Sequence, residues 1–381
     1  MKAIIYFGHH KVGSTALQSF LFRNQTTLMR AGLLYPGVET ESLAYTISRL
    51  LSESDDLDPA QRARLEGTAI AHPAPLNARE PHNALAFQML ARVNKTKPPQ
   101  WHAGLPAIGQ MVRALRLQAN FLQPEAVILC SEVMSNFGTR HPRLIEQVKK
   151  IYPDADHALY CVLRRPDEYL VSWHAQRLRF GDKVRSLSGG AAMAYTSTIH
   201  FDYRKTVEPW LKTFSGSPAT LRNYADALKA GGSVEDFFES HDLAMPKGVQ
   251  SVGRANESLP RAAMEVIRRA NHDLAPPDAT ALFQYLLQNG STLSPVPNKQ
   301  VEMFGAELRE KLVEAFAPIH DWLSQVTGQA RFFPDFDEML TTAPVPEEEA
   351  VAQLLGRLVP ANMPNDPTRA FITRLKQEYG R

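Results

Sequence analysis

Residues 2–29 read KAIIYFGHHKVGSTALQSFLFRNQTTLM, and this stretch decides the fold. The apolar run at 2–7 predicts a short buried strand. A helix is expected at 15–29, where apolar residues recur at helical spacing, namely Leu17, Phe20, Leu21 and Leu28. The 8–14 loop joins these two elements. A glycine-containing loop that opens a helix is typical of phosphate sites, since the N–H groups at a helix N-terminus attract anions.

The 8–14 loop carries the residue types that phosphate binding requires. Gly8 and Gly13 relieve steric crowding, Lys11 supplies a positive charge, and Ser14 and Thr15 supply hydrogen-bond donors. The spacing departs from the nucleoside-triphosphate loop G-x-x-x-x-G-K-[ST], because this lysine precedes the second glycine by two positions. The alternative is an ordinary strand-to-helix turn in which Ser14 caps the helix and Lys11 is solvated.

Two further strands are expected at 127–130 and 158–163, and the second runs directly into a basic segment. Pro166 restricts Arg165 to extended geometry and is suited to the first position of a helix, which is expected at 167–179. Both basic segments therefore follow a strand and precede a helix. In open parallel sheets, ligands bind at that edge.

The rest of the chain continues the α/β pattern. The segment 37–102 has weaker periodicity and recurring prolines, so it is expected to be a mostly helical or looping insert. Further elements are expected as helices at 203–214 and 234–240, a strand at 219–224, and mainly helix at 259–323. The predicted fold class is α/β, with a central, mostly parallel sheet flanked by helices.

Composition excludes several classes of protein. The 381 residues include 42 Lys plus Arg and 40 Asp plus Glu, so the net charge of +2 offers no field for binding nucleic acid or an anionic membrane. The hydrophobic fraction of 44% is sufficient for a folded core. Cys130 and Cys161 lie in apolar runs without CxxC spacing, so buried, reduced thiols are expected.

The sequence predicts a cytoplasmic protein without stable membrane insertion. The apolar stretch Ile4 to Phe7, which Gly8 follows at once, is too short for a signal peptide, and no run approaches the ~18 apolar residues of a membrane-spanning helix. Export without a cleaved signal is the alternative. The oligomeric state cannot be read from the sequence.

Arg164 and Ser172 form a second possible phosphate site. Arg164 ends a strand, and Ser172 follows eight residues later on the expected helix. A guanidinium and a hydroxyl brought together in this way can bind one phosphate. The alternative is that Arg164 and Arg165 form ion pairs with Asp167 or Glu168, while Ser172 is an ordinary helix residue.

Segments 7–18 and 163–173 together resemble the two signature segments of sulfotransferases that use 3′-phosphoadenosine 5′-phosphosulfate (PAPS). In that family a loop written KTGTT or KTGST holds the 5′-phosphosulfate, and an R-x-P segment with a serine eight residues after the arginine holds the 3′-phosphate. This chain has Val12 where threonine is usual. Weaker similarity to bacterial members of the superfamily extends to Leu33–Gly37, Ser131-Glu132, Tyr203 with Trp210, and Asn256–Leu259.

The resemblance implies a P-loop-like three-layer fold over residues 1–330, with residues 331–381 as an extension packed on that domain. It implies PAPS as the co-substrate, with no metal. The implied donor-binding residues are His10, Lys11, Val12, Gly13, Ser14, Thr15, Arg164 and Ser172. Lys11 is also expected to stabilise the leaving phosphate. For the rings of His9 and His10, a solvated or core-facing position is an equally open alternative.

The acceptor side is less defined. The resemblance suggests a hydroxyl on a carbohydrate or polysaccharide, and lipids, small molecules and peptides remain open. Glu132, after a strand, is the expected proton acceptor, and His82 is its rival; either could instead be structural. Two other functions also stay open, a P-loop kinase or nucleotide hydrolase and a non-catalytic module that binds nucleotides or glycans.

Overall fold

The computed structural model describes residues 1–52, 59–60, 74–102, 104–252 and 258–380. Contacts divide the chain into two compact units. Unit 1 comprises Met1–Arg164 and Arg204–Arg254, and unit 2 comprises Arg165–Tyr203 and Ala255–Arg381. The predicted organisation, with residues 1–330 as one domain and residues 331–381 packed on it, stays a prediction; the contacts group the C-terminal segment with residues 165–203.

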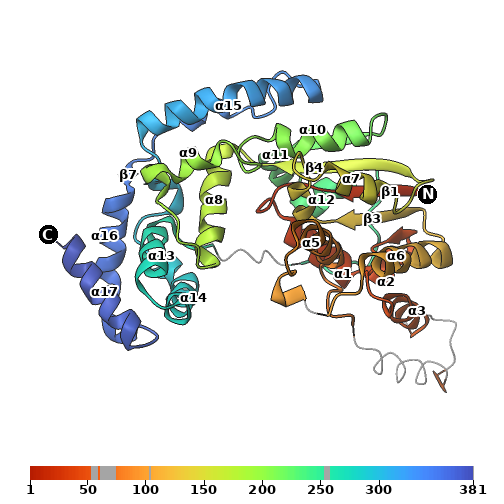
Figure 1. The fold of residues 1–381 in the computed structure, drawn as a ribbon, viewed down its shortest axis with the longest axis horizontal. Helices are drawn as coiled ribbons and strands as arrows, with labels where there is room; N and C mark the ends of the chain where they lie inside the picture. Colours follow the sequence, from red (N-terminus) through yellow and green to blue (C-terminus); the bar gives the residue numbers. More distant parts are fainter. Residues whose placement is uncertain (53–58, 61–73, 103, 253–257, 381) are drawn as a thin grey trace. The chain divides into compact units, whose positions relative to one another are not determined.

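Unit 1 is built on a five-stranded parallel sheet (Figure 1). Its strand order is β2-β3-β1-β4-β5, so β1 is central. The strands are β1 Lys2–Tyr6, β2 Leu33–Leu34, β3 Ala126–Cys130, β4 Asp156–Leu163 and β5 Ala219–Asn223. The predicted α/β class with a mostly parallel sheet flanked by helices is confirmed, and the expected strands at 2–7, 127–130, 158–163 and 219–224 are present.

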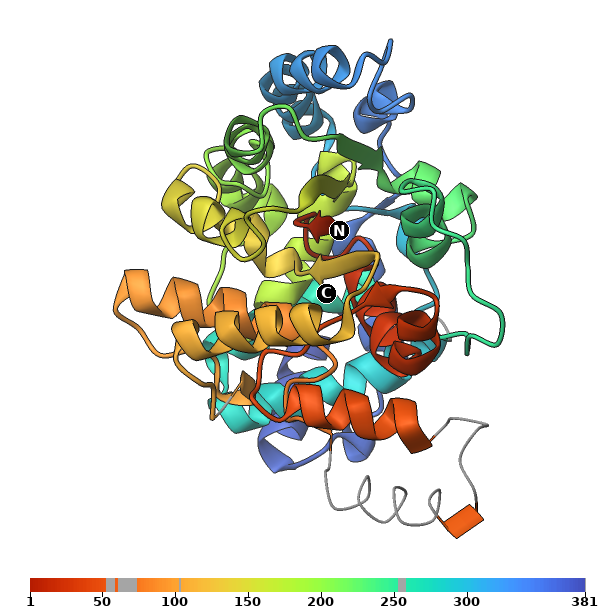
Figure 2. The ribbon, with the colours of Figure 1, turned by 90° about the vertical axis from the view of Figure 1, so that its right-hand side faces the viewer.

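Helices lie on both faces of this sheet (Figures 1 and 2). On one face Ile4 and Tyr6 of β1 pack in a core with Leu17 and Phe237. On the other, the ring of Phe7 stacks on Trp210 with centroids 4.5 Å apart. Strands buried on both faces explain the continuous apolar runs in the sequence. The helices are α1 Ser14–Arg23, α2 Gln25–Arg30, α3 Ser42–Ser52, α5 Pro81–Asn94, α6 Ile108–Leu122, α7 Pro142–Lys149, α10 Arg204–Thr213, α11 Tyr224–Lys229 and α12 Ser233–Glu239.

The single helix expected at 15–29 is wrong, because the structure has two helices that meet at Asn24. The Asn24 side chain donates to the carbonyl of Phe20 at 2.9 Å and to that of Gln250 at 3.0 Å. Asparagine side chains compete with helical backbone hydrogen bonds in this way. Helical periodicity alone does not reveal such a break.

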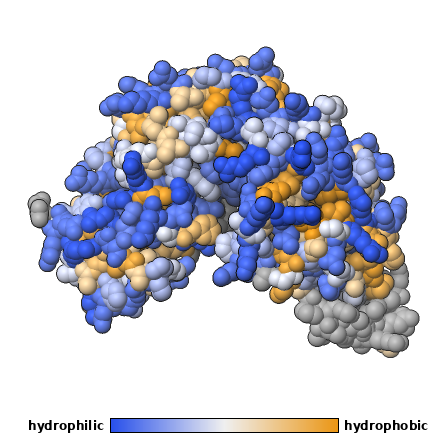
Figure 3. All heavy atoms as spheres, in the orientation of Figure 1, coloured by the Kyte–Doolittle hydropathy of each residue, from blue (hydrophilic) through white to orange (hydrophobic). Residues whose placement is uncertain are grey.

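Unit 2 is mainly helical, as expected for the C-terminal part. Its tail helices pack on earlier ones, α16 on α13 and α17 on α14 and α16, and their exposed face is mostly hydrophilic (Figure 3). The elements are α8 Pro166–Arg179, a π-helical turn Leu187–Ala191, α9 Ala192–Tyr195, α13 Arg261–Asp273, α14 Pro276–Leu293, β6 Val301–Glu302, α15 Ala306–Thr327, β7 Val345–Pro346, α16 Glu347–Arg357 and α17 Asp366–Tyr379. The short parallel pair β6–β7 was not expected. Across the described ranges, no helix has both the length and the apolar character needed to cross a membrane.

Candidate functional site

The 8–14 loop leaves the carboxyl end of the central strand and stays close to β4. The N–H of His9 donates to the carbonyl of Val162 at 3.1 Å. A Cβ added at Gly8 would lie 2.7 Å from the Val162 nitrogen, so only glycine fits there. The start of the loop is therefore anchored to the neighbouring strand.

The second half of the loop turns through two left-handed residues. Lys11 has φ 62° and Gly13 has φ 88°. A Cβ at Gly13 would lie 1.7 Å from the Ser233 hydroxyl oxygen, and that hydroxyl donates to the carbonyl of Val12 at 3.3 Å. The N-terminus of α12 thus fixes the turn that presents Lys11, whose side chain is exposed.

Val12, the departure from the sulfotransferase pattern, is fully buried and belongs to the core under the sheet. An apolar side chain at this position attaches the loop to the core.

Ser14 does not cap α1, so the interpretation of Ser14 as a simple N-cap is wrong. The N-cap residue is Gly13, and no side chain makes a capping hydrogen bond there. Ser14 is the first helical residue and is buried, and its side chain lowers the pKa of Glu132. Thr15 is exposed in the same helical turn.

Glu132 begins the 3₁₀ turn Glu132–Asn136 after β3 and is held by side chains from two helices. Gln18 of α1 donates to one carboxylate oxygen at 3.0 Å, and Asn83 of α5 donates to the other at 3.1 Å. Asn83 also donates to Glu80 at 3.2 Å. A carboxylate thus lies at the carboxyl edge of the sheet, in contact with α1.

Burial raises the pKa of Glu132 above the usual glutamate value, and the charge of Glu80 raises it further. Hydrogen bonds from its own backbone N–H and from Asn83 and Ser14 act in the opposite direction without cancelling the increase. A carboxylate with a raised pKa is a better proton acceptor than an ordinary one.

His82 occupies the core rather than the loop edge. It is fully buried, its ring packs edge-on against Tyr35 with centroids 5.0 Å apart, and its Nδ1 accepts the N–H of Cys130 at 3.1 Å. Burial lowers the pKa of His82 to about 3. Its catalytic role stays a prediction, but these contacts describe a structural residue and favour Glu132 as the proton acceptor.

The two loop histidines differ from each other. His9 is buried, whereas His10 is partly buried and its Nε2 lies 3.5 Å from the side-chain nitrogen of Asn136. Burial lowers the pKa of His10 to about 4, and the adjacent charge of Lys11 contributes in the same direction. His10 is therefore a neutral imidazole beside the lysine at pH 7.

Arg164 follows β4, the strand beside β1, and its guanidinium carbon lies 5.4 Å from the ring centroid of Tyr224. Tyr224 in turn lies 3.9 Å from the position that a Cβ on Gly13 would take. Along the chain β1 is followed by β2 on one side of the sheet, and β4 is followed by β5 on the other. Connections that diverge in this way open a crevice in which α/β proteins bind ligands.

Arg165 forms ion pairs, which was the alternative that the sequence left open. Within unit 2 it pairs with Asp167, Asp335 and Glu338, each at 2.8 Å, and it is buried. Ser172 lies on α8 in unit 2, whereas Arg164 belongs to unit 1. The joint phosphate site of Arg164 and Ser172 therefore stays a prediction.

The other segments of the resemblance have mixed positions. Tyr203 and Trp210 are each fully buried within their own unit, so both are core packing residues. Asn256 and Glu257 lie outside the described residues.

Several residues of this arrangement were missed by sequence reasoning. Gln18 lies one helical turn after Ser14, and that spacing could have suggested a shared face. Asn83 reaches Glu132, and Ser233 reaches the loop, only through tertiary packing, so no local signal identifies them.

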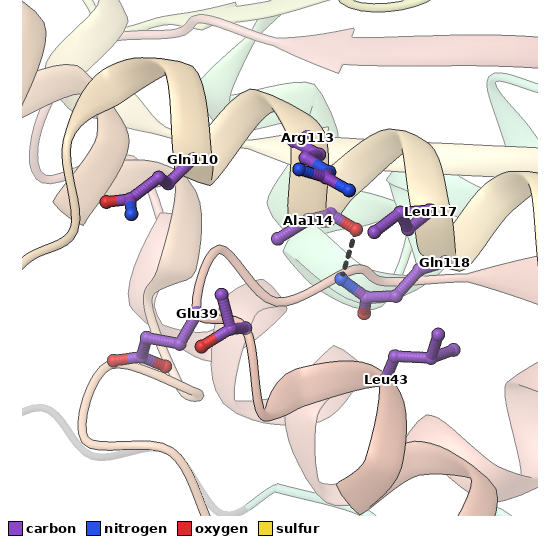
Figure 4. A pocket seen from close by; sticks show the side chains of 8 residues that line it. Glu39, Leu43, Gln110, Arg113, Ala114, Leu117 and Gln118 are labelled. Carbon is purple, nitrogen blue, oxygen red and sulfur yellow. Dashed lines mark hydrogen bonds between the residues drawn. The ribbon is translucent and has the colours of Figure 1, made fainter.

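A cavity of about 310 Å³ lies in unit 1 between α6 and the segment that leads into α3 (Figure 4). In the close view Glu39 and Leu43 lie on one side, and Gln110, Arg113 and Leu117 project from α6. None of the residues predicted for donor binding or catalysis lines it. Among the residues with described positions, no cluster of three or more His, Cys, Asp or Glu side chains could hold a metal ion.

A scan against protein-family models, a search of curated proteins and a search of solved structures found no match to this chain.

Proposed function

We propose that this chain is a sulfotransferase that moves the sulfuryl group of PAPS to an acceptor hydroxyl. The observation that carries the proposal is that Lys11 and Arg164 follow the carboxyl ends of two adjacent parallel strands, β1 and β4. The chain leaves these two strands toward opposite sides of the sheet. Two cationic positions at one sheet edge suit a donor with two separated phosphates, and the finer description of the fold as P-loop-like belongs to the same proposal.

The 8–14 loop would hold the 5′-phosphosulfate. Backbone N–H groups from Val12 to Thr15 stand at or next to the start of α1, and the first N–H groups of a helix have no partner within it. Lys11 would place its ammonium by the oxygen that bridges phosphorus and sulfur. The spacing between Lys11 and Ser14 supports this donor over a nucleoside triphosphate, whose loop places the lysine directly before the hydroxyl residue.

The 3′-phosphate would bind to Arg164. A guanidinium donates in a fork that matches phosphate geometry. Contact with the Tyr224 ring would orient this fork.

The transfer step would use Glu132. The acceptor oxygen forms a bond to sulfur as the bond between sulfur and the bridging oxygen breaks, and that electron pair moves onto the 5′-phosphate. The acceptor proton goes to the Glu132 carboxylate. Lys11 stabilises the charge on the departing phosphate, and no metal is required in this scheme.

The acceptor is proposed to be a carbohydrate hydroxyl, as the resemblance suggests. A cytoplasmic location is proposed as well, because Cys130 and Cys161 are free thiols and thiols persist in reducing compartments.

The test is transfer of radiolabelled sulfate from PAPS to a panel of neutral and anionic oligosaccharides, run in EDTA and run again with ATP and Mg²⁺. We expect labelled carbohydrate in EDTA. Magnesium-dependent ATP turnover without sulfate transfer would identify a kinase or hydrolase instead. Tight binding of 3′,5′-adenosine diphosphate with no transfer to any acceptor would indicate a non-catalytic binding module.

A further inference from the structure

Two carboxylates share the side-chain amide of Asn83. Its nitrogen donates to Glu132 at 3.1 Å and to Glu80 at 3.2 Å. Its oxygen accepts the Ser131 hydroxyl at 2.7 Å and the Gln18 amide at 3.3 Å. A flipped amide would lose its bonds to both carboxylates and to Gln18, so the nitrogen is fixed between the two carboxylates.

A shared amide keeps two like charges close together. Each N–H bond of Asn83 favours the ionised form of the carboxylate it reaches, whereas the neighbouring negative charge disfavours it. The pair is partly buried, with Glu80 and Glu132 both at intermediate exposure, so solvent screens their repulsion only in part.

The groups around Glu132 come from several elements. Gln18 donates to it from α1. Three buried groups interact with it electrostatically, namely Tyr6 of β1, Tyr35 after β2 and Cys130 of β3, and burial raises the pKa of Tyr35 well above its usual value. Burial raises the pKa of Tyr6 and of Cys130 far above neutrality, so both are uncharged at pH 7. Glu80 is then the charged neighbour among these groups, and its second oxygen pairs with the exposed Arg79.

We propose that Glu80 is a positioning residue for Glu132, which it reaches through Asn83, and that it sets the pH range in which Glu132 accepts the acceptor's proton. This inference rests on the proposed function, because it takes Glu132 as the proton acceptor of sulfuryl transfer. Glu80 itself neither gains nor loses the transferred proton. Its negative charge makes Glu132 more basic than Asn83, Ser14 and Gln18 alone would allow.

The first experiment needs no catalytic activity. The full chain is labelled with ¹³C-glutamate, and the Glu132 carboxyl signal is followed by NMR from pH 3 to pH 9, with Glu132→Gln used to assign it. Glu80→Gln should move the Glu132 midpoint down by about half a pH unit or more. Asn83→Ala should move it up, since it removes a hydrogen bond to the ionised form. The matched control is Glu41→Gln, an exposed glutamate of the same unit.

The second experiment measures the pH dependence of kcat/KM for sulfate transfer. Glu80→Gln should shift the acid limb to lower pH and reduce the plateau several-fold, since a less basic Glu132 is a weaker proton acceptor. Loss of activity without a shift of the acid limb would mean that Glu80 is only structural, and it would overturn the inference.

The two experiments separate the inference from the function on which it rests. An unchanged Glu132 titration in Glu80→Gln overturns the coupling whatever the protein catalyses. A shifted titration in a protein that transfers no sulfate overturns the proposed function, and with it the catalytic part of the inference, while the coupling of the two carboxylates stands.

Discussion

In unit 2 the buried Arg309 pairs with carboxylates of opposite charge, whereas in unit 1 the carboxylate of Glu132 lies beside a second carboxylate, that of Glu80. Arg309 is buried, donates to Glu302 at 2.9 Å and lies 3.8 Å from Asp167. Asp167 also pairs with Arg165. Glu132 instead shares one amide with Glu80. Charge networks that serve stability are balanced, and strained ones concentrate at functional sites, so the comparison points to unit 1 for the chemistry.

The largest expected effect comes from Lys11→Ala. Loss of the cation at the leaving oxygen should reduce kcat by at least about 10³-fold and leave much of the affinity for 3′,5′-adenosine diphosphate, because the other phosphate contacts remain. Steady-state kinetics and titration calorimetry give the two values. Lys247→Ala, at an exposed position of the same unit, is the control. Full activity in Lys11→Ala would show that Lys11 does not stabilise the leaving phosphate.

Arg309→Ala tests whether the buried ion pair of Arg309 and Glu302 stabilises unit 2. It leaves Glu302 without its cation, and breaking a buried ion pair costs about 3 kcal/mol of unfolding free energy. Urea denaturation followed by circular dichroism measures the loss. The control is Arg331→Ala, which removes the exposed pair of Arg331 and Asp337 and should have little effect. Equal effects of both variants would show that burial does not set the strength of these pairs.

Arg164→Ala tests the second phosphate position. Loss of a charged hydrogen-bond donor should weaken binding of 3′,5′-adenosine diphosphate about 10- to 100-fold. Arg164→Lys should restore only part of the affinity, because lysine lacks the planar fork. Calorimetry with Arg92→Ala as the exposed control measures both. Unchanged affinity in Arg164→Ala would place the 3′-phosphate elsewhere.

A smaller effect is expected from the pH dependence of stability in unit 2. Burial alone would raise the pKa of Glu302, but the hydrogen bonds from Arg309 and from backbone N–H groups outweigh it and hold that pKa below the usual value. The resulting stabilisation is present above the ordinary glutamate pKa and is lost as pH falls through the lowered one. Denaturation midpoints in acid should therefore depend less on pH in Arg309→Ala than in the unaltered chain. Parallel pH curves would contradict this assignment.

The sheet and its loops could be predicted because their signals are local. Apolar runs at 2–7 and 158–163 marked strands that are buried on both faces, and glycine and proline marked the turns after them. Lys11 and Arg164 were placed at strand ends by the same reasoning. The break at Asn24 was missed, since it depends on a contact with Gln250 far along the chain.

The partners of the charged groups could not be predicted. The sequence predicted one ion-pair partner of Arg165, namely Asp167. Its other two partners, Asp335 and Glu338, lie about 170 residues away in sequence and were not predicted. Asn83 was passed over beside His82, although Asn83 reaches Glu132 and His82 packs in the core. Asn83 on α5 and Glu132 after β3 come together only after folding, and no spacing rule in a single sequence encodes that contact.

The most direct test of the central claim is a crystal structure of the chain with 3′,5′-adenosine diphosphate. The account predicts the 5′-phosphate within hydrogen-bond distance of the N–H groups from Val12 to Thr15, and the 3′-phosphate at the guanidinium of Arg164. A nucleotide bound with neither phosphate at these positions would contradict the account.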